Sequence, residues 1–100
     1  VNLSGKQMRY RDECQSVANL ITQAYTLGPS TRFITKIPYT ITIDPNNQRA
    51  EVNNVPCTFP TKKVVNNLGS SAPFSITVLT TPVSIEIINQ GNTIMVRNVI

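Results

Sequence analysis

The chain contains no histidine, and this absence excludes several kinds of active site. Histidine is the side chain most often used as a general base near neutral pH and as a metal ligand. Without it, neither a Ser–His nor a Cys–His nucleophile pair can form, and two cysteines alone cannot make a four-ligand zinc site. Glycine is also scarce, at four residues, which leaves little material for a glycine-rich phosphate loop. We therefore expect no enzyme activity, no bound metal and no cofactor.

Acidic residues number only five, and their positions do not predict a catalytic carboxylate pair. Asp12 and Glu13 are adjacent in a predicted helix, so their side chains point about 100° apart. Asp44 begins a turn, and its expected role is to cap that turn. Glu51 and Glu86 could meet across strands, but two isolated strand carboxylates are usually exposed to solvent.

Charged residues make up 14% of the chain, against roughly 25% in an ordinary soluble domain. The net charge of +4 comes from nine scattered lysines and arginines. A nucleic-acid-binding protein usually concentrates such residues on one element together with aromatic side chains. We therefore interpret the positive charge as solvated surface charge, and we expect neither a nucleic-acid partner nor a small-molecule substrate.

Long apolar runs are missing as well. No run of eighteen apolar residues is present, which excludes a membrane-spanning helix within this sequence, and no signal-peptide core is visible. The polar surface is instead supplied by twelve threonines and eleven asparagines, which suit exposed strands and turns. Valine and isoleucine recur at strand spacing through the second half, so the chain does not resemble a disordered tail.

Residues 1–27 form the predicted helical part, with the strongest amphipathic pattern over 4–26. Ser4 is a candidate N-cap with Gln7 three residues later, which is the capping-box arrangement. Gly28 and Pro29 predict its end. The first two turns lack a clean apolar stripe, so we expect residues 1–9 to project beyond the body. The expected packing face consists of residues at helical spacing: Tyr10, Cys14, Val17, Ile21 and Ala24.

Residues 28–100 form the predicted β body, in which the apolar period changes to two. Pro38 interrupts the first run, over 33–43, and predicts an edge strand or a bend. Pro56 and Pro60 mark residues 54–61 as a loop. Further strands are expected near 48–53, 62–66, 74–78, 83–87 and 93–99. The sequence thus predicts one α+β domain over 1–100, with one long helix packed on an antiparallel sheet or small sandwich of about six to seven short strands.

The two cysteines, Cys14 in the predicted helix and Cys57 in the predicted loop, are 43 positions apart. They form either a disulfide or two unrelated buried thiols, since a free cysteine packs as a small hydrophobic residue. Both lie in polar local sequence, where a lone thiol gains little, so we predict a disulfide. In the chain-entropy account such a bridge stabilises the fold by ~4 kcal/mol.

A glycosylation sequon is present at Asn2, followed by Leu3 and Ser4. Such a site is used only if the protein is secreted. Low charge, a surface rich in threonine and asparagine, and a disulfide all favour an extracellular location.

Several segments together are similar to one known family. The segments are Leu20-Ile-Thr-Gln-Ala-Tyr-Thr-Leu-Gly-Pro29, Lys36-Ile-Pro38, Ile41–Ile43 with the turn after it, and Thr93–Val99. In this pattern of types and spacings, which spans most of the chain, the sequence resembles the soluble part of archaeal type IV pilin-like proteins with class III signal peptides.

The resemblance implies a hydrophobic helix upstream of Val1, which would account for the absence of an initial Met. Such a helix anchors in the membrane before assembly and packs in a filament core afterwards, while the β domain faces outward. The implied partners are other pilin-like subunits or envelope proteins at the cell surface. Lys6, Arg9 and Arg11 depart from the apolar helix start of many filament subunits, which leaves a membrane-anchored accessory protein open.

A second hypothesis is an immunoglobulin-like binding module of an envelope or archaellum-associated, membrane-anchored protein. Such a sandwich does not need a long helix packed along it. The predicted helix therefore favours the first hypothesis, a structural or assembly subunit.

Overall fold

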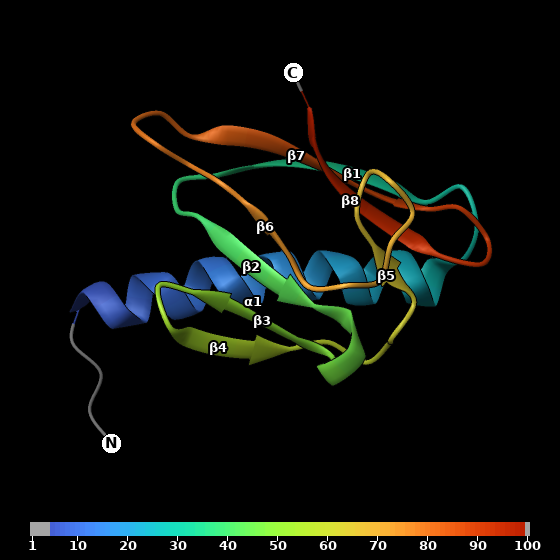
Figure 1. The fold of residues 1–100 in the computed structure, drawn as a ribbon, viewed down its shortest axis with the longest axis horizontal. Coiled ribbons are helices and arrows are strands. Elements are labelled where there is room, and N and C mark those ends of the chain that lie inside the picture. Colours follow the sequence, from blue (N-terminus) through green and yellow to red (C-terminus); the bar gives the residue numbers. More distant parts are fainter. Residues whose placement is uncertain (1–4, 100) are drawn as a thin grey trace.

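The computed structural model describes residues 5–99, and these form one helix followed by eight strands (Figure 1). The α+β prediction is confirmed. Within the described residues, no helix is both long and apolar enough to cross a membrane. The elements, in chain order, are α1 (Gly5–Leu27), β1 (Arg32–Ile37), β2 (Ile41–Asp44), the short 3-10 helix η1 (Pro45–Asn47), β3 (Arg49–Val52), β4 (Val55–Thr58), β5 (Val64–Val65), β6 (Phe74–Ile76), β7 (Val83–Asn89) and β8 (Ile94–Val99).

The strands form two four-stranded sheets, with the orders β1-β7-β8-β5 and β4-β3-β2-β6. Neighbouring strands are antiparallel, except that β5 pairs in parallel with β8. In the first sheet Ile87 is opposite Phe33 on one side and Val96 on the other. In the second, Ile43 is opposite Ala50 and Phe74. The inward-facing isoleucines of both sheets therefore meet in one core.

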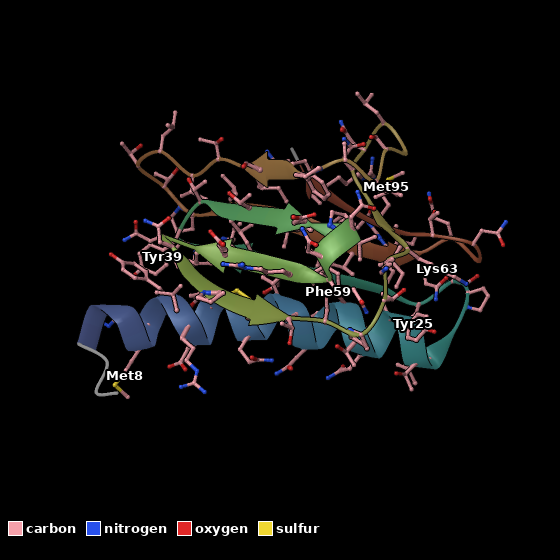
Figure 2. All side chains as sticks on the ribbon, turned by 60° about the horizontal axis from the view of Figure 1, so that its bottom comes forward. Met8, Tyr25, Tyr39, Phe59, Lys63 and Met95 are labelled. Atoms are coloured by element: carbon pink, nitrogen blue, oxygen red, sulfur yellow. A yellow bond between two sulfur atoms is a disulfide. The ribbon has the colours of Figure 1, made fainter. Side chains whose placement is uncertain are left out.

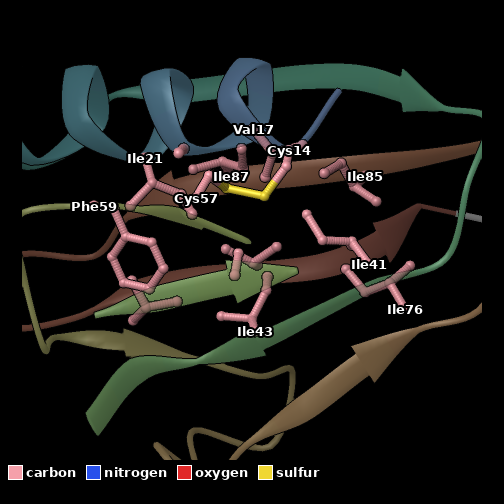
Figure 3. Packing of buried hydrophobic residues seen from close by; sticks show 14 of the residues in the cluster. Cys14, Val17, Ile21, Ile41, Ile43, Cys57, Phe59, Ile76, Ile85 and Ile87 are labelled. Carbon is pink, nitrogen blue, oxygen red and sulfur yellow. A yellow bond between two sulfur atoms is a disulfide. The ribbon is translucent and has the colours of Figure 1, made fainter. Parts of the chain in front are cut away.

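Helix α1 bridges the two sheets. It contacts β4 and β3 of one sheet and β7, β1 and β8 of the other. Because β4 and β1 are edge strands, the helix closes the side on which the sheets would otherwise be open. One hydrophobic cluster joins the helix to both sheets, and Ile21, Ile43 and Ile87 in it are fully buried (Figure 3).

The structure places the predicted packing face of α1 against this cluster. Cys14, Val17, Ile21 and Ala24 are each at most 1% exposed, and Tyr10 is half-buried against the same residues. At 3.6 residues per turn these positions form one stripe, which is why the helix needs a partner from Tyr10 to Ala24.

The C-terminal end of α1 is held by the sheet. Gly28 takes a positive φ of 94°, and its N–H donates to the carbonyl of Ala24 at 3.3 Å. The side-chain amide of the buried Asn89, from β7, donates to the same carbonyl at 2.8 Å. The carbonyl of Ala24, in the last turn of the helix, therefore accepts two hydrogen bonds.

The predicted bend at Pro38 is present: the run 33–43 is two strands in different sheets, and Tyr39 lies in this bend and not on a strand. Other details of the predicted β body are corrected by the structure. The predicted strand 62–66 shortens to two residues, β5. Its partner β8 runs parallel to it, whereas the sequence predicted antiparallel pairing.

The predicted loop 54–61 contains strand β4. Asn53 and Asn54 both have positive φ, 49° and 68°, which matches the two-residue turn favoured in tight hairpins. Pro56 pairs with Glu51, and β4 is an edge strand. At an edge, proline can sit where its missing N–H would face away from the ladder, so Pro56 does not prevent the strand.

The packing face of α1 makes a stability prediction. Replacing Ile21 with Ala should lower the free energy of unfolding by about 2–5 kcal/mol, because it leaves a cavity under the helix. Gln23→Ala, on the exposed face of the same helix, should change it by less than about 0.5 kcal/mol. Urea unfolding of both variants measures this, and equal stabilities would show that the face does not form the core.

Candidate functional site

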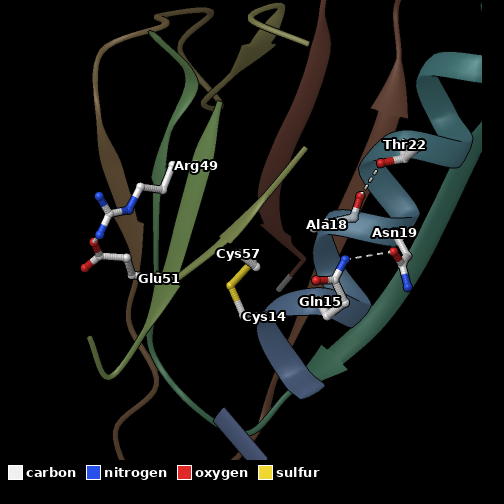
Figure 4. The surroundings of a disulfide bond; sticks show 8 residues. All are labelled: Cys14, Gln15, Ala18, Asn19, Thr22, Arg49, Glu51 and Cys57. Carbon is white, nitrogen blue, oxygen red and sulfur yellow. Dashed lines mark hydrogen bonds and ion pairs between the residues drawn. A yellow bond between two sulfur atoms is a disulfide. The ribbon is translucent and has the colours of Figure 1, made fainter. Parts of the chain in front are cut away.

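A disulfide fixes the first half of α1 to the β body. Cys14 and Cys57 are bonded, with their Cα atoms 5.9 Å apart, so the predicted bridge is confirmed (Figure 4). Cys57 is buried on β4, the strand nearest the helix. The bond lies within the packing face, so covalent and apolar contacts hold the same stretch of α1.

The start of the helix extends past the sheets. Gly5, Met8 and Arg9 are exposed, and Met8 keeps 54% of its surface accessible. Figure 1 shows these first turns beyond the turn between β3 and β4, and Figure 2 shows Met8 pointing away from the body. Among the side chains that the structure describes, Tyr10 is the first along α1 to pack on the core cluster.

A cleft opens where the helix meets the body, with a volume of about 560 Å³. Two of its lining residues, Tyr10 and Tyr39, pack their rings edge to face, with centroids 4.9 Å apart and planes at 83°. Figure 2 shows Tyr39 at the end of the body that lies over the first half of α1. The remaining lining comes from the bend after β1, from β2 and β3, and from the turns after β3 and β6: Pro38, Thr40, Thr42, Glu51, Asn53, Asn54, Val78 and Leu79.

Hydrogen bonds and ion pairs order the walls of this cleft. Thr40 Oγ1 exchanges hydrogen bonds with Val78, accepting from its N–H at 2.9 Å and donating to its carbonyl at 3.2 Å. This closes the bend after β1 onto the loop after β6. Glu51 forms an ion pair with Arg49 on the same face of β3 (Figure 4).

A second polar cluster lies on the outer face of the β1-β7-β8-β5 sheet, around Glu86. Its carboxylate accepts a hydrogen bond from Arg97 at 2.7 Å and another from Arg32, and the residue is only 3% exposed. The hydrogen bond from Arg97, then that from Arg32, lower the pKa of Glu86 below its ordinary value of 4.5, although burial alone would raise it. The cluster therefore joins β1, β7 and β8 through their side chains.

The sequence-predicted site residues have different outcomes. Asn2 and Ser4 lie outside the described residues. Glu51 and Glu86 do not meet, because they belong to different sheets. Glu86 is also buried, not exposed as expected from its residue type.

Two features of the site were missed by sequence reasoning. Glu86 stands between the core residues Ile85 and Ile87, and a carboxylate in such a run needs cationic neighbours on the adjoining strands. Arg32 and Arg97 are these neighbours, and their register with β7 cannot be read from the local sequence. The cleft gave no local signal, because its lining residues come together only in the folded chain.

Comparisons with protein-family models, with curated proteins and with solved structures found no match to this chain.

The Glu86 cluster predicts a pH dependence. Because the pKa of Glu86 is lowered on folding, its stabilising contribution is complete above pH 4.5 and is lost as the pH falls through the folded-state pKa. Glu86→Gln should lower the unfolding free energy at pH 7 by about 1–2 kcal/mol, since the two arginines are half-exposed. The two stability curves should converge at acid pH.

Denaturant unfolding between pH 2 and 7 measures both curves. Glu51→Gln is the matched control, because it removes a more exposed ion pair and should cost less than about 0.5 kcal/mol. A constant difference between wild type and Glu86→Gln at every pH would contradict the assignment.

Proposed function

We propose that this protein is a cell-surface structural or assembly subunit of the pilin-like kind, which acts through its surface and an N-terminal anchor and not by catalysis. The observation that carries the proposal is the attachment of α1. From Cys14 to Ala24 the helix is fixed to both sheets, whereas its first turns extend past them.

Three kinds of contact make the helix and the body one mechanical unit. The apolar face is buried, the disulfide bonds α1 to β4, and Asn89 holds the C-terminal end of the helix. A load applied to the start of the helix would therefore be passed to both sheets. This is what a subunit needs if it is anchored or assembled through its N-terminal helix.

The disulfide also supports a place outside the cytoplasm, because structural disulfides persist mainly in oxidising compartments. The exposed start of α1 is then the connection to a hydrophobic helix upstream, which would lie in the membrane or in a filament core. Other pilin-like subunits or envelope proteins are the partners that fit this arrangement.

The alternative is an immunoglobulin-like binding module on a membrane anchor. Two packed sheets favour it in part. The strand orders 4-3-2-6 and 1-7-8-5 differ, however, from the two sheets of an immunoglobulin sandwich, and α1 closes one side of the body. The attached helix therefore favours the structural subunit.

A test on intact cells of the natural host, expressing the full-length gene, decides where the domain lies. A membrane-impermeant amine reagent should label the exposed Lys36, Lys62 and Lys63, and the protein should sediment with membranes or sheared filaments until detergent is added. A cytoplasmic protein of the same cells is the control. Labelling only after lysis would overturn the proposal.

A photo-crosslinking residue at Met8 then separates assembly from simple anchoring. Crosslinks to a second copy are expected from a filament subunit, and crosslinks to a different envelope protein from an accessory subunit. The same residue at Gln23, which is also exposed but lies over the body, should give neither product. Equal crosslinking from both positions would show that the projecting turns are not the contact.

A further inference from the structure

The outer face of the β2–β3 pair carries two adjoining hollows. The cleft of about 560 Å³ and a smaller hollow of about 160 Å³ share Thr42 and Glu51, which are opposite each other in the sheet. We call the two together the β2–β3 groove. One end holds the Tyr10–Tyr39 pair and the Asn53–Asn54 turn, and Thr42 and Glu51 follow. The second hollow is lined in addition by Asp44, Asn47, Arg49 and Pro73.

The aromatic end of the groove provides a stacking surface. Tyr10 and Tyr39 meet edge to face, so they do not cover both faces of each other's rings. A phenol ring at the wall of an open cleft combines an apolar face with a polar hydroxyl. Ligands that have an apolar C–H face and a hydroxylated edge match both parts.

The same end of the groove presents neutral amides from a fixed turn. Asn53 and Asn54 both lie in the left-handed region, in the two-residue connection between paired strands. Each side chain offers two N–H donors and a carbonyl acceptor. Such groups bind hydroxyls, which both donate and accept, and do not favour ions of either sign.

Charge in the groove argues against a phosphate ligand. Arg49 is paired with Glu51, and Asp44 accepts a hydrogen bond from Asn47 at 2.6 Å. The three charged residues sum to one negative charge, and a nucleic acid would need an excess of lysine or arginine here. Lys36, Lys62 and Lys63 are not among the described residues that line the groove.

The sheet also argues against a peptide that adds as a strand. β3 is paired on both sides, by β4 and β2, and β2 is paired by β3 and β6. The ladder groups of these two strands are therefore already used, so a peptide cannot add to either of them as a further strand.

We propose that the β2–β3 groove binds a neutral oligosaccharide, with a sugar ring against Tyr39 or Tyr10 and hydroxyls on the amides of Asn53 and Asn54. This site goes beyond the structural role proposed above and does not depend on it. A length of several sugar rings fits a groove formed by two hollows in a row better than a single ring does.

The test is a two-dimensional amide NMR titration of the purified chain with four neutral hexasaccharides. The probes are maltohexaose, cellohexaose, mannohexaose and hexa-N-acetylchitohexaose, each added up to about 10 mM, since affinities near 1 mM are expected for a few hydrogen bonds and one stacked ring. At least one probe should give saturable shifts at Tyr39, Thr42, Glu51, Asn53 and Asn54.

One double variant, with glycine at positions 53 and 54, tests the side-chain amides without disturbing the fold. Asn53→Gly with Asn54→Gly removes both side chains at positive φ, where glycine is well tolerated, and should weaken binding at least tenfold. Ser30→Gly is the matched control, because Ser30 also has a positive φ, of 74°, but lies outside the groove, and it should bind as the wild type does.

The outcomes separate the possibilities. Absence of shifts with all four probes, or equal binding by the double glycine variant, would overturn the proposal. A sulfated oligosaccharide and a short single-stranded DNA serve as anionic probes, and binding of either one at the groove in place of the neutral probes would also overturn it. None of these results depends on where the cell places the protein, so this proposal and the proposed surface role can fail independently.

Discussion

The apolar face of α1 closes the side on which the two sheets would otherwise be open to water. Each sheet ends on this side in an edge strand, β4 or β1, and the helix contacts both. Val17, Ile21 and Ala24 enter the same cluster as the isoleucines of the sheets. With the helix removed, that cluster would be exposed to solvent on one side, and much of the stabilisation from apolar burial would be lost. The disulfide and Asn89 also hold the helix on the sheets, the disulfide within the packing face and Asn89 at the C-terminal end.

The features of functional interest follow from where this helix sits. The cleft exists because Tyr10 on α1 meets Tyr39 in the bend that carries the chain from one sheet to the other. The first turns of α1 project because the helix starts beyond the end of the two sheets. On the outer face of the β1-β7-β8-β5 sheet, Glu86 of β7 forms ion pairs with Arg32 of β1 and Arg97 of β8. These ion pairs stabilise the sheet that holds the C-terminal end of the helix.

Sequence patterns predict the elements whose signals are local. The stripe from Tyr10 to Ala24 and the Gly28–Pro29 stop are enough for the helix, and period-two alternation is enough for β7 and β8. Strand β4 was missed because a proline was weighed more heavily than the Asn53–Asn54 turn before it, although proline is tolerated at an edge. The edge position itself is a property of the whole sheet, so the local sequence could not decide between a loop and a strand.

The site was harder to predict than the fold for the same reason. Tyr10, Tyr39 and Asn53 are far apart in sequence, and only the packing of α1 and the bend at Pro38 bring them to one cleft. The burial of Glu86 likewise depends on the register of β7 with both neighbours. The disulfide could be predicted from the sequence, because the chain has two cysteines and only one bridge can form between them.

The central claim is that α1 and the two sheets unfold as one unit while the first turns of the helix stay outside it. Native-state hydrogen exchange of the oxidised monomer tests this residue by residue. Amides from Val17 to Ala24 should exchange only through global unfolding, with the same opening free energy as those of β7, and amides from Gly5 to Arg9 should exchange much faster. If the helix amides open at a free energy well below that of β7, or if those from Gly5 to Arg9 are equally protected, the helix is not the fixed connection described above.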